Sequence, residues 1–392
     1  MVETVIVGAA RTPMGAFQGE LSSFSATELG AIAIKGTLKS ANIKPYHVDE
    51  LLMGCVLPAG LRQAPARQAG ILANLPKTVP AVTVNKVCGS GMKTIIMACD
   101  QIKAGSSGVV IAGGMESMSN APYISDATRA GKRLGHTGLN DHMFTDGLED
   151  AFQTNKLMGH FAEDCATKYQ FTREDQDDFA IRSLRRAIKS QSDGVYKSEI
   201  VPINLKMRSG EKSILDDEQP RRANIEKIPF LKPAFQNGGS ITAANASSIS
   251  DGAAAVAICS ASKARQMSFP ICARIIGYAG YAHDSEWFTT APIYAVKKLL
   301  SMVGWTTKEV DLWEVNEAFA VVPMAFMRDL DISGDRVNIR GGACALGHPI
   351  GASGARIVVT LLNALQSGGL KKGIAAICLG GGEALAVAIE RA

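Results

Sequence analysis

Apolar and polar positions along residues 1–118 follow the pattern of buried strands separated by helices. Runs rich in valine and isoleucine predict strands at VETVIVGAA, ELLMGCVL, AVTVNKV and GVVIAGG. The segment ATELGAIAIKGTLKSA predicts an amphipathic helix that ends near Asn42, and GMKTIIMACDQIKAG predicts a second helix. Such alternation indicates a parallel or mixed sheet with helices on both faces.

The pattern changes between about Ser119 and Ser250, where glycine, charge and short broken helices replace it. Residues 129–150 predict an exposed excursion, and residues 173–191 predict a charged surface helix. The run DGAAAVAICS, from Asp251, again has the composition of a buried strand. We therefore expect an α/β protein in three parts: residues 1–118 with 251–269 as an N-terminal half, 119–250 as an inserted loop domain, and 270–392 as a C-terminal half.

Two stretches repeat one order of features: a glycine-rich turn, a helix, glycine, an apolar strand and an acidic residue. In residues 88–116, CGSGMKTII leads through a helix to GVVIAGGME; in residues 351–383, GASGARIVV leads through a helix to AAICLGGGE. Two copies indicate duplicated domains rather than a solenoid. Copies packed face to face would form one cleft from equivalent turns of both halves.

Reactive residues precede both repeated helices. Cys88 lies at the predicted N-terminus of its helix, where free N–H groups and the helix dipole favour a thiolate. His348, in GHPIG, approaches the second helix in the same way, so the repeat predicts a Cys88–His348 pair of nucleophile and base across the cleft. The alternatives are a buried structural cysteine and a turn or core histidine.

Two further residues end predicted strands. Cys378 is followed by Leu379 and then by a triple glycine, and Asn316 ends the run WEVN. Taken singly, Cys378 could be a core cysteine and Asn316 the N-cap of the next helix. Four such groups, all at the turns of a duplicated fold, favour an active site.

Composition and charge narrow the function classes. The chain has 392 residues and a net charge of +4, with basic and acidic residues interspersed, which is unlike a nucleic-acid-binding stripe. Its eight cysteines form no CxxC pair and no zinc spacing, which indicates a reducing compartment and no metal site. The sequence shows no signal peptide and no apolar run of ~18 residues, so we expect a cytoplasmic protein without a membrane or nucleic-acid partner.

Five motifs carry a family resemblance: VCGSGM, GGMESMS, NEAFA, GGACALGHPIGASGAR and CLGGG. Through them the chain resembles the thiolases over essentially its whole length, and the acetyl-CoA acetyltransferases most closely. The resemblance implies the thiolase fold, with two similar βαβ-type halves packed as αβαβα layers. It also implies reversible Claisen condensation of two acetyl-CoA to acetoacetyl-CoA and CoA. Two alternatives stay open: a degradative 3-ketoacyl-CoA thiolase of broad chain length, and a non-catalytic thiolase-fold protein that binds lipid.

The resemblance also implies roles for the site residues. Cys88 would take the acyl group as a thioester, and His348 would accept its proton. Cys378 would be the acid/base, and Asn316 would hold a water that forms one oxyanion hole with His348. The backbone N–H groups of Cys88 and Gly380 would form the second hole. No metal or redox cofactor is implied.

Coenzyme A, as substrate, would run along the insertion and the second half. The residues that the resemblance assigns to this path are Met158, Arg221, Ser247, Phe288, Ala318 and Phe319. Arg221 suits adenine stacking or a phosphate contact, or alternatively it is a solvated arginine in a charged loop. Leu157 stands where bacterial biosynthetic members usually carry histidine.

Two further expectations concern potassium and assembly. Phe288 and the run AANA from Ala243 resemble potassium-responsive mitochondrial thiolases, although Pro220 stands where that subgroup tends to carry tyrosine. Potassium binding is therefore an expectation that equal activity in sodium and potassium buffers would exclude. Residues 119–145 match the loop through which such enzymes form tetramers, so we expect a homotetramer built as a dimer of dimers.

Overall fold

Strand pairing in the computed structural model, which describes residues 2–125, 128–207 and 210–392, gives two half-sheets with one plan. The first half-sheet has the order β4 (Ala81–Val84), β3 (Glu50–Gly54), β5 (Val109–Ser117), β10 (Ser250–Ser260) and β1 (Thr4–Arg11). The second has the order β12 (Leu312–Val315), β13 (Lys372–Leu379), β14 (Glu383–Arg391) and β11 (Ala273–Ala282). A short strand, β2 (Gly15–Ala16), pairs with β10.

Strand directions repeat between the halves, which confirms the predicted duplication. In the first half β3 is parallel to β5, and β5, β10 and β1 then follow one another antiparallel. In the second half β12 is parallel to β13, and β13, β14 and β11 then follow antiparallel. The half-sheets join through two residue pairs of β1 and β11, Val5 with Arg274 and Ile6 with Ala273.

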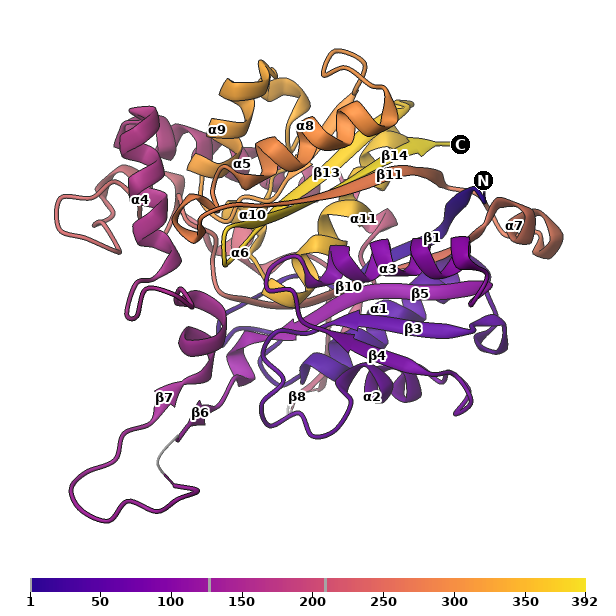
Figure 1. Cartoon of the computed structure of the whole chain (residues 1–392), viewed down its shortest axis with the longest axis horizontal. Coiled ribbons are helices and arrows are strands. Elements are labelled where there is room, and N and C mark those ends of the chain that lie inside the picture. The colour runs from indigo at the N-terminus through magenta and orange to yellow at the C-terminus, as the bar shows by residue number, and fades with distance from the viewer. Residues whose placement is uncertain (1, 126–127, 208–209) are drawn as a thin grey trace.

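Helices form three layers around these half-sheets (Figure 1). The central layer is α3 (Ser90–Ala104) and α11 (Ile350–Gly368), whose apolar residues share one core with the inner faces of both half-sheets. The helices α1 (Ala26–Ser40), α2 (Pro65–Leu72) and α7 (Ala261–Met267) cover the first half. The helices α8 (Ala291–Val303) and α9 (Val321–Leu330) cover the second. The expected αβαβα layering of the thiolase fold is therefore confirmed.

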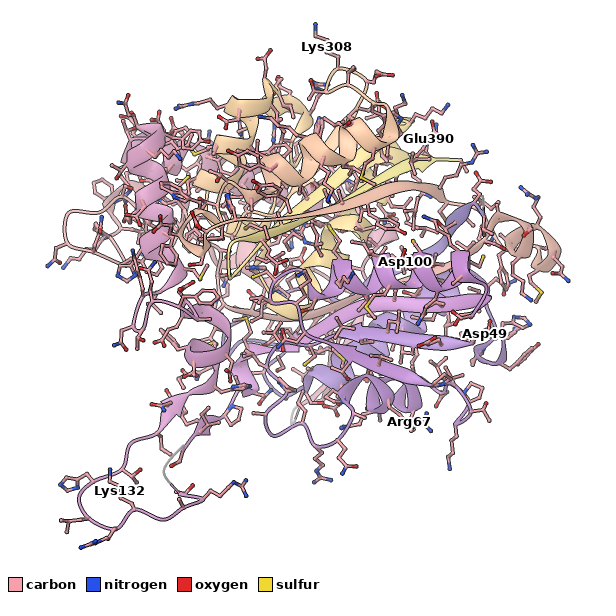
Figure 2. All side chains as sticks on the ribbon, in the orientation of Figure 1. Asp49, Arg67, Asp100, Lys132, Lys308 and Glu390 are labelled. Carbon is pink, nitrogen blue, oxygen red and sulfur yellow. The ribbon has the colours of Figure 1, made fainter. Side chains whose placement is uncertain are left out.

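Residues between β5 and β10 supply smaller elements and an extended arm. Helices α4 (Met158–Tyr169), α5 (Arg173–Ser192) and α6 (Glu218–Arg222) and the pair β8 (Ile203–Met207) and β9 (Gly210–Ile214) lie against the body. The pair β6 (Tyr123–Ile124) and β7 (Asn140–Asp141) carries the arm, which projects at the lower left of Figure 1. Figure 2 shows Lys132 near its tip, as the predicted exposed excursion requires.

The remaining helical segments are short. They are η1 (Pro45–His47), η2 (Met118–Asn120), the π-helical turn η3 (Phe144–Leu148), η4 (Val195–Ser198), η5 (Ile225–Phe230), η6 (Ser285–Trp287), η7 (Gly334–Arg336) and α10 (Ala343–Leu346). The predicted charged surface helix is α5, which begins at a Thr172 capping box and buries one face that includes Phe179 and Leu184. No helix within 2–125, 128–207 and 210–392 is both long and apolar enough to cross a membrane.

A buried ion-pair network ties the insertion to β1. The Arg11 guanidinium bonds Glu199 Oε1 at 2.6 Å and both carboxylate oxygens of Asp217 at 2.6 and 2.9 Å, and all three side chains are fully buried or nearly so. Arg340, which precedes the His348 loop, adds a 3.4 Å contact to Glu199. Because each charge has a partner, the network fixes the insertion against the first half.

Arg11→Met is expected to destabilise the fold by about 3–5 kcal/mol, because it leaves two buried carboxylates uncompensated. Denaturant unfolding followed by circular dichroism measures the loss. Arg274→Met is the matched control, since its 2.8 Å pair with Glu3 is solvent-exposed and such pairs contribute at most about 1 kcal/mol. Equal losses in the two variants would show that burial of the network is not the cause.

Candidate active site

Cys88 lies in a tight turn between β4 and α3. The Asn85 side chain accepts from the Val87 N–H at 3.0 Å, and Ser90 Oγ accepts from the Lys86 N–H at 2.8 Å. Val87 has a φ of +45°, which a β-branched residue rarely adopts. Helix α3 then starts at Ser90, with Gly89 as its N-cap. The turn therefore holds Cys88, partly exposed, at a strained position just before the helix.

The first turns of α3 and α11 touch through their backbones. A Cβ added to Gly91 would lie 2.8 Å from the Ala355 nitrogen, and one added to Gly354 would lie 2.5 Å from the Met92 nitrogen. Only glycine permits this approach. Since Cys88 precedes one helix and His348 the other, the contact brings the two turns together, as the repeat predicted.

His348 is buried and held in one orientation. The Ser353 hydroxyl donates to the Pro349 carbonyl at 2.9 Å, so its oxygen is free to accept from His348 Nδ1 at 2.5 Å. This assigns the proton to Nδ1 and leaves a lone pair on Nε2. Burial, and then the Arg356 charge, lowers the pKa of His348 to about 3. The imidazole is therefore neutral at pH 7 with Nε2 ready to accept a proton.

Asn316 faces that lone pair. Its Nδ2 lies 3.4 Å from His348 Nε2, and its buried Oδ1 has no hydrogen-bond partner among the residues described. The alternative that Asn316 caps the following helix is wrong, because α9 begins only at Val321 with Ala320 as its N-cap. A buried, unpaired amide oxygen is expensive unless water or substrate occupies the site.

Ser353→Ala is expected to lower kcat about tenfold, because His348 loses the partner that fixes its tautomer. Activity against pH separates this effect from general damage: the rate should fall by the same factor across the neutral range, because the balance between two neutral tautomers does not depend on pH. Ser353→Thr, which keeps a hydroxyl, should restore most of the rate. An alanine variant with the wild-type rate and profile would contradict the assignment.

Cys378 is the penultimate residue of β13, two residues before the turn Gly380–Gly382 that leads to β14. Positive φ angles at Gly381 and Gly382 allow this turn. The backbone amides of Gly380 and Cys88 lie near enough to the Cys88 thiol to lower its pKa, and the two cysteines are near enough to influence each other's charge. The structure therefore places Cys88, Cys378 and Gly380 in one group.

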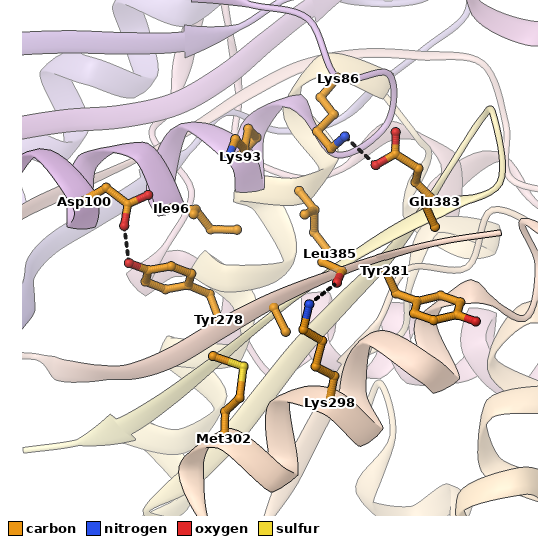
Figure 3. A pocket seen from close by; sticks show the side chains of 13 residues that line it. Lys86, Lys93, Ile96, Asp100, Tyr278, Tyr281, Lys298, Met302, Glu383 and Leu385 are labelled. Carbon is orange, nitrogen blue, oxygen red and sulfur yellow. Dashed lines mark hydrogen bonds and ion pairs between the residues drawn. The ribbon is translucent and has the colours of Figure 1, made fainter.

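An ion pair on the outer side links the two cysteine turns. Lys86 Nζ lies 2.5 Å from Glu383 Oε2, at one end of an open groove between α3 and strands β11 and β14 (Figure 3). Lys86 comes two residues before Cys88, and Glu383 directly follows the triple glycine. The pair therefore spans the turns that carry the two cysteines.

Neither cysteine is a thiolate at rest, contrary to the sequence prediction. Burial raises the pKa of Cys88 to about 12, although the Gly380 and Cys88 N–H groups oppose it. Burial and then the neighbouring Cys88 raise the pKa of Cys378 well above its usual range. Helix and glycine turn thus lower the pKa less than burial raises it, and Cys88 needs an external base.

Alkylation of Cys88 by iodoacetamide should therefore accelerate about tenfold per pH unit between about pH 6 and 10, because the thiolate fraction is small and rises with pH. Mass spectrometry of the tryptic peptide 87–93 reports Cys88 alone. Cys272, which is also partly exposed, supplies an internal comparison. A plateau already reached near pH 7 would indicate a preformed thiolate.

The residues expected on the coenzyme A path lie in two places. Phe288, Ala318 and Phe319 are buried, with the Phe288 and Phe319 ring centroids 6.3 Å apart. Ser247 joins them, because its N–H donates to the Ala318 carbonyl at 2.9 Å. Met158 starts α4, and its Cε lies 4.0 Å from where a Cβ on Gly380 would be. Of these five, Met158 lies beside Gly380, and Phe288, Ala318 and Phe319 belong to the same core cluster as Cys378.

Arg221 lies apart from this group. It is exposed, and its guanidinium pairs with Glu20 at 2.6 Å. Leu157 is the N-cap residue of α4, where its N–H bonds His160 Nδ1 at 3.2 Å, and Pro220 is buried within α6.

Two residues of the site escaped the sequence reasoning. Ser353 was visible only as part of the glycine-rich turn GASG, and Glu116 only as the acidic residue that ends the first repeat. Glu116 proves to be fully buried and bonded to Gly351, three residues after His348. The repeat itself could have found Ser353, because this serine in GASG stands at the same position as Ser90 in CGSG.

Comparison with known proteins identifies the family. Residues 4–262 match the family model of the thiolase N-terminal domain, and residues 269–391 match that of the thiolase C-terminal domain. The chain belongs to the thiolase family.

Particular relatives are also similar over full length. Acetyl-CoA acetyltransferase 2 of Arabidopsis thaliana is 48% identical, covering 99% of this chain and 97% of its own. Among solved structures, the Bacillus anthracis acetyl-CoA acetyltransferase superposes with a TM-score of 0.97 at 39% identity, covering 100% and 99% of the two chains. Human mitochondrial 3-ketoacyl-CoA thiolase superposes with a TM-score of 0.96 at 36% identity, with the same coverage.

Proposed function

We propose that this thiolase is an acetyl-CoA C-acetyltransferase that condenses two acetyl-CoA into acetoacetyl-CoA and CoA, and runs the reverse thiolysis. The observation that carries the proposal is the split site: Cys88 and a neutral His348 precede two helices whose first turns touch, and Cys378 lies beside Cys88. Full-length similarity to proteins named acetyl-CoA acetyltransferase supports the choice of reaction.

In the first half-reaction, Cys88 Sγ attacks the thioester carbonyl of acetyl-CoA. Its proton passes to His348 Nε2, which holds a free lone pair and is neutral. The tetrahedral oxyanion accepts hydrogen bonds from the Cys88 and Gly380 N–H groups, which lie near enough to the thiol to lower its pKa. Collapse releases CoA, protonated from His348, and leaves acetyl-Cys88.

In the second half-reaction, the Cys378 thiol first gives its proton to water, and the resulting thiolate removes a proton from the methyl group of the next acetyl-CoA. The released proton later returns to the Cys88 thiolate. The enolate oxygen accepts a hydrogen bond from a water held by Asn316, whose Oδ1 has no other partner among the residues described. The carbanion attacks acetyl-Cys88, and acetoacetyl-CoA forms as the Cys88 thiolate leaves. In thiolysis the order reverses, and a Cys378 thiol with a raised pKa is already protonated for its role as acid.

Substrate length separates this proposal from a broad-chain degradative thiolase. Cys88 packs against a cluster of buried apolar residues, which limits the room beside it for a long acyl chain: Val56, Leu57, Met118, Met143 and Ile350. We expect kcat/KM for acetoacetyl-CoA thiolysis to exceed that for 3-ketohexadecanoyl-CoA by about 10²-fold or more. Comparable values for the two substrates would favour the degradative alternative.

Further parts of the proposal concern coenzyme A and assembly. Residues 119–250 would act as the loop domain that binds coenzyme A, with Met158 and Ser247 along its path beside Phe288, Ala318 and Phe319.

The projecting arm exposes Tyr123, Leu134 and Leu139, which favours burial against other copies in a homotetramer. Eight free cysteines suit a cytoplasmic location, and potassium stays a prediction.

A further inference from the structure

Glu116, on β5, is a fully buried carboxylate that accepts four hydrogen bonds. Its Oε2 accepts from the Val56 N–H and the Gly351 N–H, each at 2.9 Å. Its Oε1 accepts from the Leu57 N–H at 3.2 Å and from the Cys55 thiol at 3.5 Å. Every partner is a donor, so the arrangement fits the ionised carboxylate and would oppose a proton on it.

The donors come from both halves of the molecule. Cys55 to Leu57 follow β3 in the first half, whereas Gly351 lies in the first turn of α11 in the second. Helix α11 has Pro349 as its N-cap, without a side-chain cap of its own. Glu116 therefore satisfies an N-terminal N–H of that helix from across the interface, where a negative charge is also favoured by the helix dipole.

The two segments that Glu116 joins lie beside the proposed catalytic residues His348 and Cys88. Gly351 comes three residues after His348, and Val56 and Leu57 belong to the apolar cluster that packs against Cys88. The nearby titratable groups are the thiols of Cys55 and Cys88, and the pKa of Cys88 is raised mainly by burial and additionally by the Glu116 charge. Burial raises the pKa of Glu116 itself to about 7, against the opposing effect of its backbone donors.

We propose that Glu116 is a positioning residue that clamps the first turn of α11 to the loop after β3, and so fixes His348 relative to Cys88. It touches no substrate, and it acts through the two segments that it joins. The inference rests on the proposed function, because its main readout is turnover.

The clamp and its charge have opposite consequences for Cys88. Loss of the clamp lets His348 shift relative to the nucleophile, and misplacements of about 1 Å cost up to about 10²-fold in rate. Loss of the charge alone favours the Cys88 thiolate, because a like charge nearby disfavours it. Removing the carboxylate should therefore slow turnover while it speeds alkylation of Cys88.

Two variants separate these effects. Glu116→Gln keeps the size of the side chain and removes its charge, and we expect kcat for acetoacetyl-CoA thiolysis to fall about 10- to 100-fold. Iodoacetamide labelling of Cys88 at fixed pH should at the same time become faster. Glu116→Asp keeps the charge on a shorter side chain that cannot reach all four donors, so kcat should fall while labelling keeps the wild-type rate. If the glutamine variant does not fold, the aspartate variant alone carries the kinetic test.

Asp49→Asn is the matched control. The Asp49 carboxylate also accepts hydrogen bonds from backbone N–H groups, those of Gly108 and Val109. These residues lie at the start of β5, whereas Glu116 lies near its end. We expect kcat and Cys88 labelling of Asp49→Asn to match the wild type, even if its melting temperature falls. Equal losses of kcat in Asp49→Asn and Glu116→Gln would reduce Glu116 to a general stabiliser of β5.

Two results would overturn the inference. One is a Glu116→Gln variant with kcat within twofold of the wild type. The other is faster labelling of Cys88 in both Glu116 variants, which would show that greater exposure of Cys88, and not loss of the Glu116 charge, causes the change. Failure of the proposed function looks different, because the wild type itself would then lack thiolysis. The labelling comparison would still report on Glu116 in that case.

Discussion

Cys88→Ser is expected to lower kcat for acetoacetyl-CoA thiolysis by at least about 10³, because the acyl carrier is removed from a site built around its sulfur. Serine is nearly isosteric but far less acidic, and an ester on it lacks the activation of a thioester. The strained turn that presents residue 88 is unaffected by the change. A steady-state assay of thiolysis, with melting temperature as a check on folding, measures the effect.

Cys272→Ser serves as the control for that variant. Cys272 is likewise partly exposed, but it lies at the start of β11, where its N–H bonds the Ile6 carbonyl. Its kcat should stay within about twofold of the wild type, as surface substitutions usually do. A Cys88→Ser variant that keeps a tenth of the wild-type rate would mean that acyl transfer does not pass through this residue.

Cys378→Ala is expected to lower turnover about 10²–10⁴-fold in both directions while leaving acetylation of Cys88 intact, because it removes only the proton transfer. The two cysteines lie close together but belong to different halves and different steps. Deuterium exchange into the methyl group of acetyl-CoA isolates that step, and the variant should lose it.

His348→Asn provides the comparison for Cys378→Ala. It removes the base that the first step needs, so acetylation of Cys88 should slow. In Cys378→Ala, by contrast, acetylation should keep its rate and only the second step should slow. Wild-type exchange of the methyl protons in Cys378→Ala would assign the proton transfer to another group.

Much of the fold followed from local pattern. The valine-rich runs became β1, β3 and β5 because a strand buried on both faces must be continuously apolar. A similar run became the edge strand β4, which is only half-buried. The duplicated turns also placed Cys88 and His348 before contacting helices, because equivalent turns of packed copies meet. The sequence alone was sufficient to predict these strands and turns, since periodicity and turn chemistry are local properties.

Electrostatics at the site could not be predicted in the same way. The turn around Cys88 indicated a thiolate, but burial by residues distant in sequence, among them Ile350, raises the pKa instead. The same holds for the two acidic residues that end the repeats. Glu116 is a buried acceptor of four donors, whereas Glu383 is half-exposed and pairs with Lys86. Equal positions in a repeat do not fix equal environments.

Asn316 illustrates a further limit. Its place at a strand end suited either an N-cap or an oxyanion site, and only the distance to His348 distinguishes them. Ser353 is similar, because its bond to Nδ1 depends on how the first turn of α11 folds back under the imidazole. Such side-chain contacts depend on the packing of both halves.

The acetyl-enzyme itself tests the account most directly. After incubation with acetyl-CoA and acid quench, trypsin releases Cys88 on peptide 87–93 and Cys378 on peptide 373–391, so mass spectrometry can assign the acetyl group. We predict acetylation of peptide 87–93 in the wild type and in Cys378→Ala, removable by added CoA. Acetyl on peptide 373–391, or on neither peptide, would contradict the assignment of Cys88 as the nucleophile.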